Sequence, residues 1–324
     1  MAVFKNKLKE QERELGFGSK NYAKSVRFLD KNGKVNVQRT GLGWYNNTDF
    51  YHSLISASLS KLILIILGTY VLINVLFACL YYIIGAQHFG GLDIPGSSKS
   101  QEFIGLFFFS AQTITTLGYG HIYPIGNAAS IAAALESLLG LLSFALATGV
   151  LYGRFSRPKA HVLYSKNILI SPYRESKGLM FRITNKKQYE LIESEAVLTM
   201  TINNPETNKR EFLNLKLEIS RVNFLAMSWT IVHHINEDSP LFGLIKNDLL
   251  ERDAEFIILI KAINDTYSQN VNSRISYKAN DLIENAKFKH LSPEATKEGK
   301  LKVSVTEIHH YDLIENATLN QKPT

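Results

Sequence analysis

The sequence predicts a membrane protein with two transmembrane α-helices, a re-entrant helix between them, an interfacial helix before them and a cytoplasmic β-sandwich after them. The apolar residues of this 324-residue chain are concentrated between positions 61 and 155. A shorter apolar segment lies between two long ones, and short alternating runs follow. We therefore expect four parts: a partly disordered N-terminal segment at 1–44, an interfacial helix at 45–60, a membrane domain at 61–157 and the sandwich at 158–324.

The charge balance favours a membrane over nucleic acid as the partner. The chain carries 36 Lys and Arg against 29 Asp and Glu, a formal charge of +7. Such an excess suits either nucleic acid or an anionic lipid surface, and no nucleic-acid motif is present. There is also no Gly-x-Gly-x-x-Gly and no nucleophile–base arrangement. The single cysteine, Cys79, lies in an apolar segment and is interpreted as a small buried hydrophobe. We expect neither an enzyme nor a cofactor.

The N-terminal part predicts little regular structure before a first helix. Residues 1–35 are rich in Lys, Glu and Asn and are expected to be mostly disordered, with a short strand at 35–39. Residues 46–59 place apolar side chains near helical spacing, with Asn47 or Thr48 as the N-cap. This pattern predicts an interfacial helix on the cytoplasmic membrane face. The alternative is an extension of the following helix.

Two segments are long enough to cross a membrane. Residues 62–84, at 1.5 Å per residue, would span roughly 34 Å, and residues 128–152 are about as long. Residues 102–114 are apolar but too short to span, which predicts a re-entrant helix enclosed by protein or lining a water-filled cavity. The negative end of its dipole would favour a cation.

The strip that follows this helix predicts an ion-binding backbone. Thr116, Leu117, Gly118, Tyr119 and Gly120 resemble the Thr-x-Gly-Tyr-Gly selectivity filter of potassium channels. Carbonyls that all point one way require partly left-handed torsions, which glycine adopts without steric cost. Such carbonyls replace the water shell of a dehydrated ion. Tyr119 is expected to brace the strip from behind.

The second span contains one acid, Glu136, for which two interpretations stand equal. A carboxylate at membrane depth must face protein or a pore. It is either a structural partner behind the strip or a charge that, together with Thr115, concentrates cations in a cavity. Gly140 and Gly149 are candidate hinges, although close helix packing explains glycine equally well.

One face of the same span is a candidate gate. Phe144, Thr148 and Tyr152 follow at steps of four and share one broad helical face. Bulky residues there can close a pore by dewetting. Ordinary contact with lipid or a helix explains each one equally well.

Basic residues after the second span set the topology. Arg154, Arg157 and Lys159 follow it directly, whereas the connection at 85–127 has only Lys99. The positive-inside rule places both termini in the cytoplasm of a multi-pass protein of the cell membrane. The same three residues are candidates for binding anionic lipid head groups, with simple anchoring as the alternative.

The remaining chain predicts an all-β sandwich. Adjacent histidines at 233–234 and 309–310 are interpreted as structural, because neighbours on a strand point to opposite faces. The predicted strands are 161–170, 178–184, 196–202, 212–219, 225–233, 255–263 and 302–308.

This layout resembles the inward-rectifier potassium channels, and their prokaryotic members most closely. The resemblance covers about residues 36–310. The segments that carry it are 49–54, both spans, 109–120, 153–158, 225–233, 239–243 and 269–277.

The resemblance implies a homotetramer that conducts K⁺ and an immunoglobulin-like domain that extends the pore. It also implies regulation by phosphoinositides near Arg154, Arg157 and Lys159. Phe144 stands where strong rectifiers have an aspartate, so only weak block by Mg²⁺ or polyamines is expected. Gln112 and His121 replace a Glu–Arg pair of the eukaryotic members.

The expected function is therefore a K⁺-selective channel, voltage-independent because no span carries repeated arginines. One alternative is a channel-like receptor with loose selectivity, whose β domain binds a soluble ligand. Another is a membrane-anchored adaptor without a pore.

Overall fold

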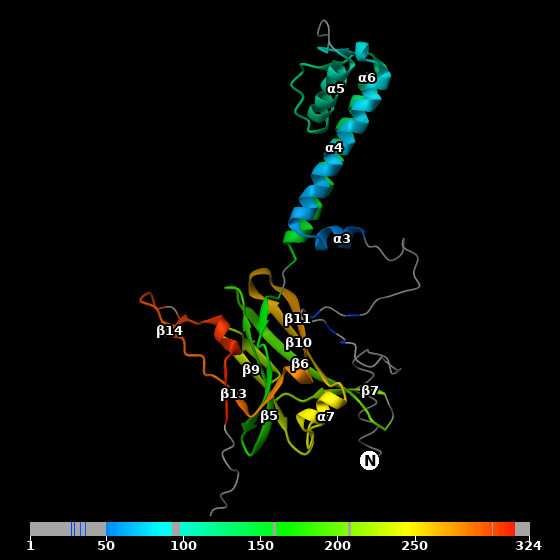
Figure 1. Ribbon diagram of the computed structural model, residues 1–324. Helices are drawn as coiled ribbons and strands as arrows, with labels where there is room; N and C mark the ends of the chain where they lie inside the picture. Colours follow the sequence, from blue (N-terminus) through cyan, green and yellow to red (C-terminus); the bar gives the residue numbers. More distant parts are fainter. Residues whose placement is uncertain are drawn as a thin grey trace, which may run out of the picture. The chain divides into compact units, whose positions relative to one another are not determined.

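The computed structural model describes residues 50–92, 98–157, 160–206, 209–299 and 301–314, together with the single positions 27, 29, 33 and 36. The chain divides into two compact units (Figure 1). Thr40–Arg157 is the membrane unit, and the β unit combines Met1–Arg39 with Pro158–Thr324. The predicted strand at 35–39, the N-caps Asn47 and Thr48, Lys159 and most of the segment 1–44 lie outside the described residues.

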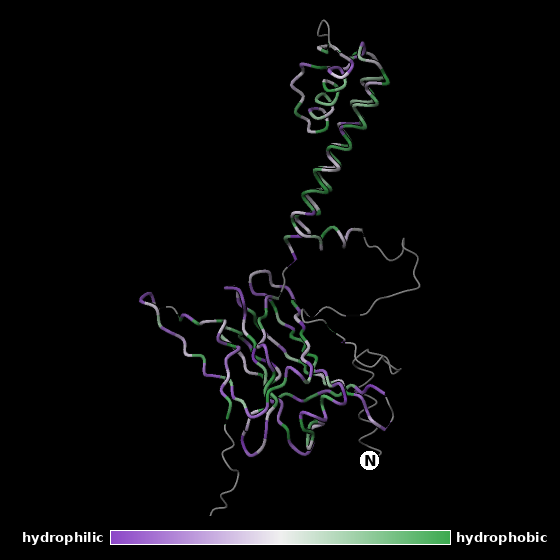
Figure 2. Tube along the Cα trace, in the orientation of Figure 1, coloured by the Kyte–Doolittle hydropathy of each residue, from purple (hydrophilic) through white to green (hydrophobic). Residues whose placement is uncertain are grey.

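The described part of the membrane unit contains four α-helices. Helix α3 spans Phe50–Ser56, α4 spans Leu59–Ile84, α5 spans Lys99–Ile114 and α6 spans Asn127–Phe155. By length and composition, α4 and α6 can each cross a membrane, and Figure 2 shows hydrophobic residues along both. A short 3₁₀ turn, η1 (Ala86–His88), leads into β1 (Phe89–Gly90), which pairs with β2 (Tyr123–Pro124). The predicted pair of spans is confirmed.

A break separates the short helix from the first span. Ser58 has extended torsions, and its side chain accepts a hydrogen bond from the Lys61 N–H at 3.3 Å. This is an N-cap, so a new helix begins there. Helix α3 is therefore a separate helix and not an extension of α4. It ends at Ser56, before the end of the predicted helix at 46–59.

Aromatic and small residues pack α5 against both spans. The rings of Tyr81, Phe89 and Phe109 contact one another with centroids 5.1 to 5.4 Å apart. The facing surface of α6 is built from small buried residues, Ala129, Ala132 and Ala133. Small side chains let helix backbones approach closely, which brings α5 against α6.

The β unit is a sandwich of two five-stranded sheets around one apolar core. In the first sheet the order is β12-β4-β5-β3, with β9 also paired to β5; in the second it is β11-β10-β6-β7, with β8 also paired to β6. The predicted fold class is confirmed. The strands are β3 (Val162–Tyr164), β4 (Ile168–Tyr173), β5 (Ser176–Asn185), β6 (Leu191–Asn203), β7 (Arg210–Leu215), β8 (Arg221–Phe224), β9 (Ser228–Ile235), β10 (Glu255–Asn264), β11 (Gln269–Lys278) and β12 (Leu282–Glu284).

Smaller elements surround the sandwich. The helical ones among the described residues are α7 (Lys246–Glu251) and the 3₁₀ turns η2 (Asp265–Tyr267), η3 (Ala279–Asp281) and η4 (Val305–His309). Two further hairpin-like pairs are β13 with β16 and β14 with β15, whose bounds are Ala286–Phe288, Tyr311–Leu313, Glu294–Ala295 and Leu301–Lys302.

Two strand predictions were wrong, and some strands, β11 among them, were not predicted. The run 161–170 forms two strands, β3 and β4, and 302–308 is mostly the turn η4. Strand β11 was missed because it is rich in Gln, Asn and Ser, is buried at only three of its ten positions and has one sheet neighbour, β10. An edge strand with little apolar content gives a weak alternation signal.

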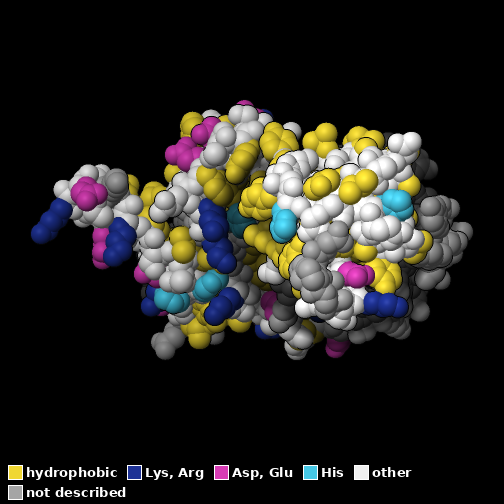
Figure 3. All heavy atoms as spheres, turned by 90° about the horizontal axis from the view of Figure 1, so that it is seen from above, with side chains coloured by type: hydrophobic (Ala, Val, Ile, Leu, Met, Phe, Trp, Pro, Cys, Tyr) yellow, Lys and Arg dark blue, Asp and Glu magenta, His cyan; other side chains and the backbone are white. Residues whose placement is uncertain are grey.

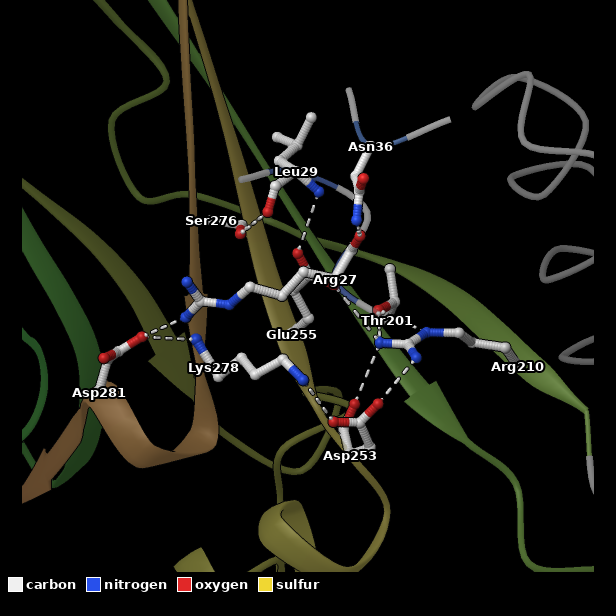
Figure 4. A network of polar contacts seen from close by, with 10 residues as sticks. All are labelled: Arg27, Leu29, Asn36, Thr201, Arg210, Asp253, Glu255, Ser276, Lys278 and Asp281. Atoms are coloured by element: carbon white, nitrogen blue, oxygen red, sulfur yellow. Dashed lines mark hydrogen bonds and ion pairs between the residues drawn. The ribbon is translucent and has the colours of Figure 1, made fainter. Parts of the chain in front are cut away.

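The described N-terminal residues lie against the β unit. Leu29 is buried with Phe212 and Ile257. Its backbone N–H donates to Glu255 at 3.5 Å, and its carbonyl accepts from the Ser276 hydroxyl at 3.2 Å (Figure 4). Part of the segment predicted to be mostly disordered is therefore packed on a sheet.

Candidate pore site

The predicted strip, Thr116–Gly120, directly follows the end of α5. The helix ends at Ile114, and the Gln112 carbonyl accepts from the N–H groups of Leu117 at 2.9 Å and Gly118 at 3.3 Å. The last carbonyls of a helix lack intrahelical partners. Here the chain turns back over one of them, which fixes where the strip starts.

Left-handed torsions recur at every second residue of the strip. Thr116, Gly118 and Gly120 have φ of 60°, 52° and 78°. The two glycines were predicted for this reason. Thr116 was not, because a β-branched residue rarely adopts a positive φ. A residue keeps such a strained torsion only where the surrounding structure enforces it, and strained torsions of this kind cluster at ligand-binding sites.

The side chains of the strip face away from their own chain. Leu117 is 54% and Tyr119 is 74% exposed. The expected packing of Tyr119 behind the strip is therefore not made by the described residues of its own chain. Thr115 instead satisfies its hydroxyl locally, donating to the Ala111 carbonyl at 2.7 Å.

A hollow of about 660 Å³ lies between α4, α6 and the start of the strip. Its walls are mostly apolar and include Thr115, Thr116, Gly140 and Phe144. Among the described residues that line it, Glu136 is absent. Thr115 therefore lines this hollow and Glu136 does not, although the sequence predicted that both residues line one cavity.

Glu136 lies behind the re-entrant helix, fully buried between α4, α5 and α6. Its carboxyl group is hydrogen-bonded to the hydroxyls of Tyr81 and Ser110. Ser110 is also 3.0 Å from Asn74 Oδ1, and Asn74 Nδ2 donates to the Tyr70 carbonyl at 2.7 Å. These are the contacts expected if Glu136 is a structural partner behind the strip.

The two candidate hinge glycines differ in their surroundings. A Cβ on Gly140 would stand 2.1 Å from the Ile114 carbonyl oxygen, whereas a Cβ on Gly149 would meet nothing within 4 Å. Close packing therefore accounts for Gly140. Helix α6 runs unbroken through both positions, and a hinge at Gly149 stays a prediction.

The three candidate gate residues are exposed within the chain. Phe144 and Tyr152 are each 73% exposed, and Thr148 is exposed as well. Because they share one face of α6, they present a continuous surface to whatever lies beyond this chain.

Arg154 joins the end of α6 to α3. Its guanidinium donates to the carbonyls of Ile55, at 3.2 Å, and Ala57. A cation at the C-terminal end of a helix also complements the dipole. The sequence predicted Arg154 as a ligand of anionic lipid head groups and gave no signal for its hydrogen bonds to the carbonyls of Ile55 and Ala57. Arg157 is exposed, and Lys159 lies outside the described residues.

In the β unit one histidine of the first adjacent pair is held by hydrogen bonds through both ring nitrogens. His233 Nδ1 is 2.7 Å from the Lys216 carbonyl and its Nε2 is 2.8 Å from the Ser239 hydroxyl. Burial lowers the pKa of His233. In the part of the chain that the structure describes, no cluster of His, Cys, Asp or Glu could hold a metal ion.

The fold and the strip together define a membrane protein with a pore-type re-entrant segment and a β-sandwich. The model of the ion channel family matches residues 62–157, and that of the inward rectifier potassium channel C-terminal domain matches residues 162–322. The chain belongs to the inward rectifier potassium channel family. Its relatives are ion channels and not enzymes.

Relatives from bacteria and vertebrates support the assignment. The chain is 34% identical over 272 residues to the inward rectifier potassium channel Kirbac3.1 of Paramagnetospirillum magnetotacticum, covering 82% of this chain and 89% of that protein. It is 25% identical over 287 residues to the ATP-sensitive inward rectifier potassium channel 12 of Gallus gallus, covering 81% and 66%. The Homo sapiens channel of that name is 24% identical over 303 residues, covering 86% and 69%.

Proposed function

We propose that four copies of this chain surround one axis and that their strips, Thr116–Gly120, form a K⁺-selective filter. The observation that carries the proposal is the alternation of left-handed torsions directly after a re-entrant helix. A ring of backbone carbonyls replaces the hydration shell of K⁺, and one strip provides only one side of such a ring. The exposed Leu117 and Tyr119 leave surface for neighbouring copies.

Conduction would be controlled at the cytoplasmic end of α6. The exposed face of Phe144, Thr148 and Tyr152 would line the pore and close it by dewetting. Because Arg154 binds the carbonyls at the end of α3, movement of the interfacial helix would be transmitted to α6. Head groups of anionic phosphoinositides would bind near Arg154, Arg157 and Lys159, with both termini in the cytoplasm.

Rubidium uptake into liposomes that contain the purified protein tests this function. We expect rubidium uptake that Ba²⁺ blocks and that excess external Na⁺ does not reduce. Gly118→Ala should abolish the discrimination, because alanine in the left-handed region costs about 1–2 kcal/mol per residue in each of four strips. Gly68→Ala is the matched control, since a Cβ there meets nothing within 4 Å.

Two results would contradict the proposal. Equal permeability to Na⁺ and K⁺ would exclude a selective filter. A stable monomer on crosslinking in membranes would exclude the tetramer and favour the adaptor. The lipid site is tested separately: phosphoinositide in the liposomes should change uptake by the wild type, and Arg157→Ala should weaken that response.

The channel-like receptor retains one supporting observation. The β unit has a hollow of about 990 Å³ whose walls carry charges of both signs, including Arg174, Lys216, Glu218 and Asp238. A soluble ligand bound there would change uptake without lipid. Intact selectivity for K⁺ over Na⁺ would count against this alternative.

A further inference from the structure

Four polar side chains from three helices meet inside the membrane unit. Asn74 and Tyr81 come from α4, Ser110 from α5 and Glu136 from α6, and each residue is fully buried. An ionised carboxylate at such a place would need a cation. Among the described residues, the polar side chains in contact with Glu136 are the hydroxyls of Tyr81 and Ser110.

Counting protons shows which form of Glu136 fits these contacts. Asn74 Nδ2 lies 2.7 Å from the Tyr70 carbonyl oxygen, so this atom must be the nitrogen, because two oxygens would repel. Asn74 Oδ1 therefore faces Ser110 at 3.0 Å and needs the hydroxyl proton of Ser110. A serine has only one proton to donate.

Three contacts then require three protons, namely Tyr81 to Oε2, Ser110 to Oε1 and Ser110 to Asn74. The hydroxyls of Tyr81 and Ser110 supply two. With an ionised Glu136, two acceptors would face each other without a proton, which is costly in a low-dielectric interior. A proton on Oε1 of Glu136 completes the set, and each group then has a partner.

We propose that Glu136 is held in its neutral, protonated form, and that the chain Glu136–Ser110–Asn74–Tyr70 fixes the re-entrant helix against both spans. The Glu136 carboxyl donates to Ser110, Ser110 donates to Asn74, and Tyr81 donates to the other carboxyl oxygen. Glu136 and Asn74 are thereby positioning residues for the strip, which begins at Thr116, six residues beyond Ser110. The positioning half of this inference depends on the proposed function, and the protonation half does not.

Infrared spectroscopy of the full-length protein in lipid at neutral pH tests the protonation. A carboxylic-acid carbonyl band should be present in the wild type and missing in Glu136→Gln. In Tyr81→Phe the band should remain and move to higher frequency, because the carbonyl has lost its hydrogen bond. If the wild type and Glu136→Gln show no difference in this band, Glu136 is ionised and the inference is wrong.

Selectivity in rubidium uptake tests the positioning. Glu136→Gln supplies a donor to Ser110 and an acceptor to Tyr81, so it should keep the wild-type preference for Rb⁺ over Na⁺. Ser110→Ala leaves buried groups without partners and should lower that preference by about tenfold. Ser137→Ala, on α6 and without a hydrogen bond among those the structure describes, is the control.

The outcomes are separable. Wild-type selectivity in Ser110→Ala would overturn the positioning role. If the wild type itself fails to conduct, the proposed function is in doubt while the infrared result still decides the protonation.

Discussion

Two fully buried carboxyl groups, one in each unit, are accommodated in opposite ways. Among the described residues, the polar partners of Glu136 on α6 are hydroxyl groups, whereas Glu255 on β10 lies 3.6 Å from the Arg210 guanidinium. An arginine beside Glu136 would itself have to be buried at membrane depth. In the β unit the same guanidinium also contacts Asp253 at 3.0 Å, so its charge is compensated. The membrane unit thus avoids charge, and the β unit pairs it.

The pairing in the β unit extends to the N-terminal segment. Asp253 contacts both Arg210, at 3.0 Å, and Lys278, at 3.1 Å, and Arg27 contacts Asp281 at 2.8 Å (Figure 4). On the face drawn in Figure 3, charged side chains lie scattered among hydrophobic ones. The network therefore fixes Arg27 and Leu29 to the sheet by charge as well as by apolar contact.

Removing the cation of this network should have the largest effect on stability. Arg210→Ala removes the guanidinium that contacts both Glu255 and Asp253, and breaking a buried pair costs about 3–5 kcal/mol. The Arg210 side chain is only 2% exposed. Denaturant unfolding of the full-length protein, followed by the fluorescence of the buried Trp229, measures the change.

An exposed pair provides the control. Arg221 and Glu193 form an ion pair at 2.9 Å with both side chains more than half exposed. Arg221→Ala should cost at most about 1 kcal/mol. Equal losses of unfolding free energy in the two variants would refute the contrast between a buried and an exposed ion pair.

A second test compares the two glycines of α6. Gly140→Ala pushes a methyl group into the Ile114 carbonyl and should cost about 1–3 kcal/mol by overpacking. It should also displace the start of the strip and reduce rubidium uptake. Gly149→Ala has open space and should stabilise the helix by roughly 0.5–1 kcal/mol.

The uptake of Gly149→Ala decides the hinge. Wild-type uptake and lipid response in this variant would remove Gly149 as a hinge, whereas a channel held in one state would support it. Wild-type stability and uptake in Gly140→Ala would contradict the packing explanation for that glycine.

A third test concerns the charge at the membrane boundary. Arg154→Ala removes the charged donor to the α3 carbonyls, worth about 1.5–3 kcal/mol. We expect uptake to change even in liposomes without phosphoinositide, because α3 is released from α6. Arg157→Ala should change uptake only when the lipid is present. The same lipid-dependent phenotype in both variants would mean that Arg154 acts as a lipid ligand alone.

The sequence predicted the elements with strong local signals. Both spans, the re-entrant helix and most long strands follow from apolar runs and alternation, and Gly118 and Gly120 follow from the torsions that the strip needs. The positive φ of Thr116 was not predictable, because only the surrounding fold forces a β-branched residue there.

Contacts between distant segments also escaped prediction. The packing of Gly140 on Ile114, the binding of Arg154 to α3 and the burial of Leu29 join positions that are 26 to 228 residues apart. No local pattern encodes such a pair in a single sequence. For Glu136, the sequence could state that a buried acid needs partners, but not that Tyr81 and Ser110 would be those partners.

The smallest expected effect is a pH dependence of the β unit. Burial lowers the pKa of His233, so the unfolded chain binds a proton more readily than the folded one. Stability should be complete above the ordinary histidine pKa of about 6.5 and should fall as the pH drops below it. His309, whose pKa burial also lowers, acts in the same direction. His233→Gln should therefore reduce this slope without removing it. Unfolding of the full-length protein measured between pH 5 and 8 decides the point, and an unchanged slope in His233→Gln would show that the buried imidazole is not its source.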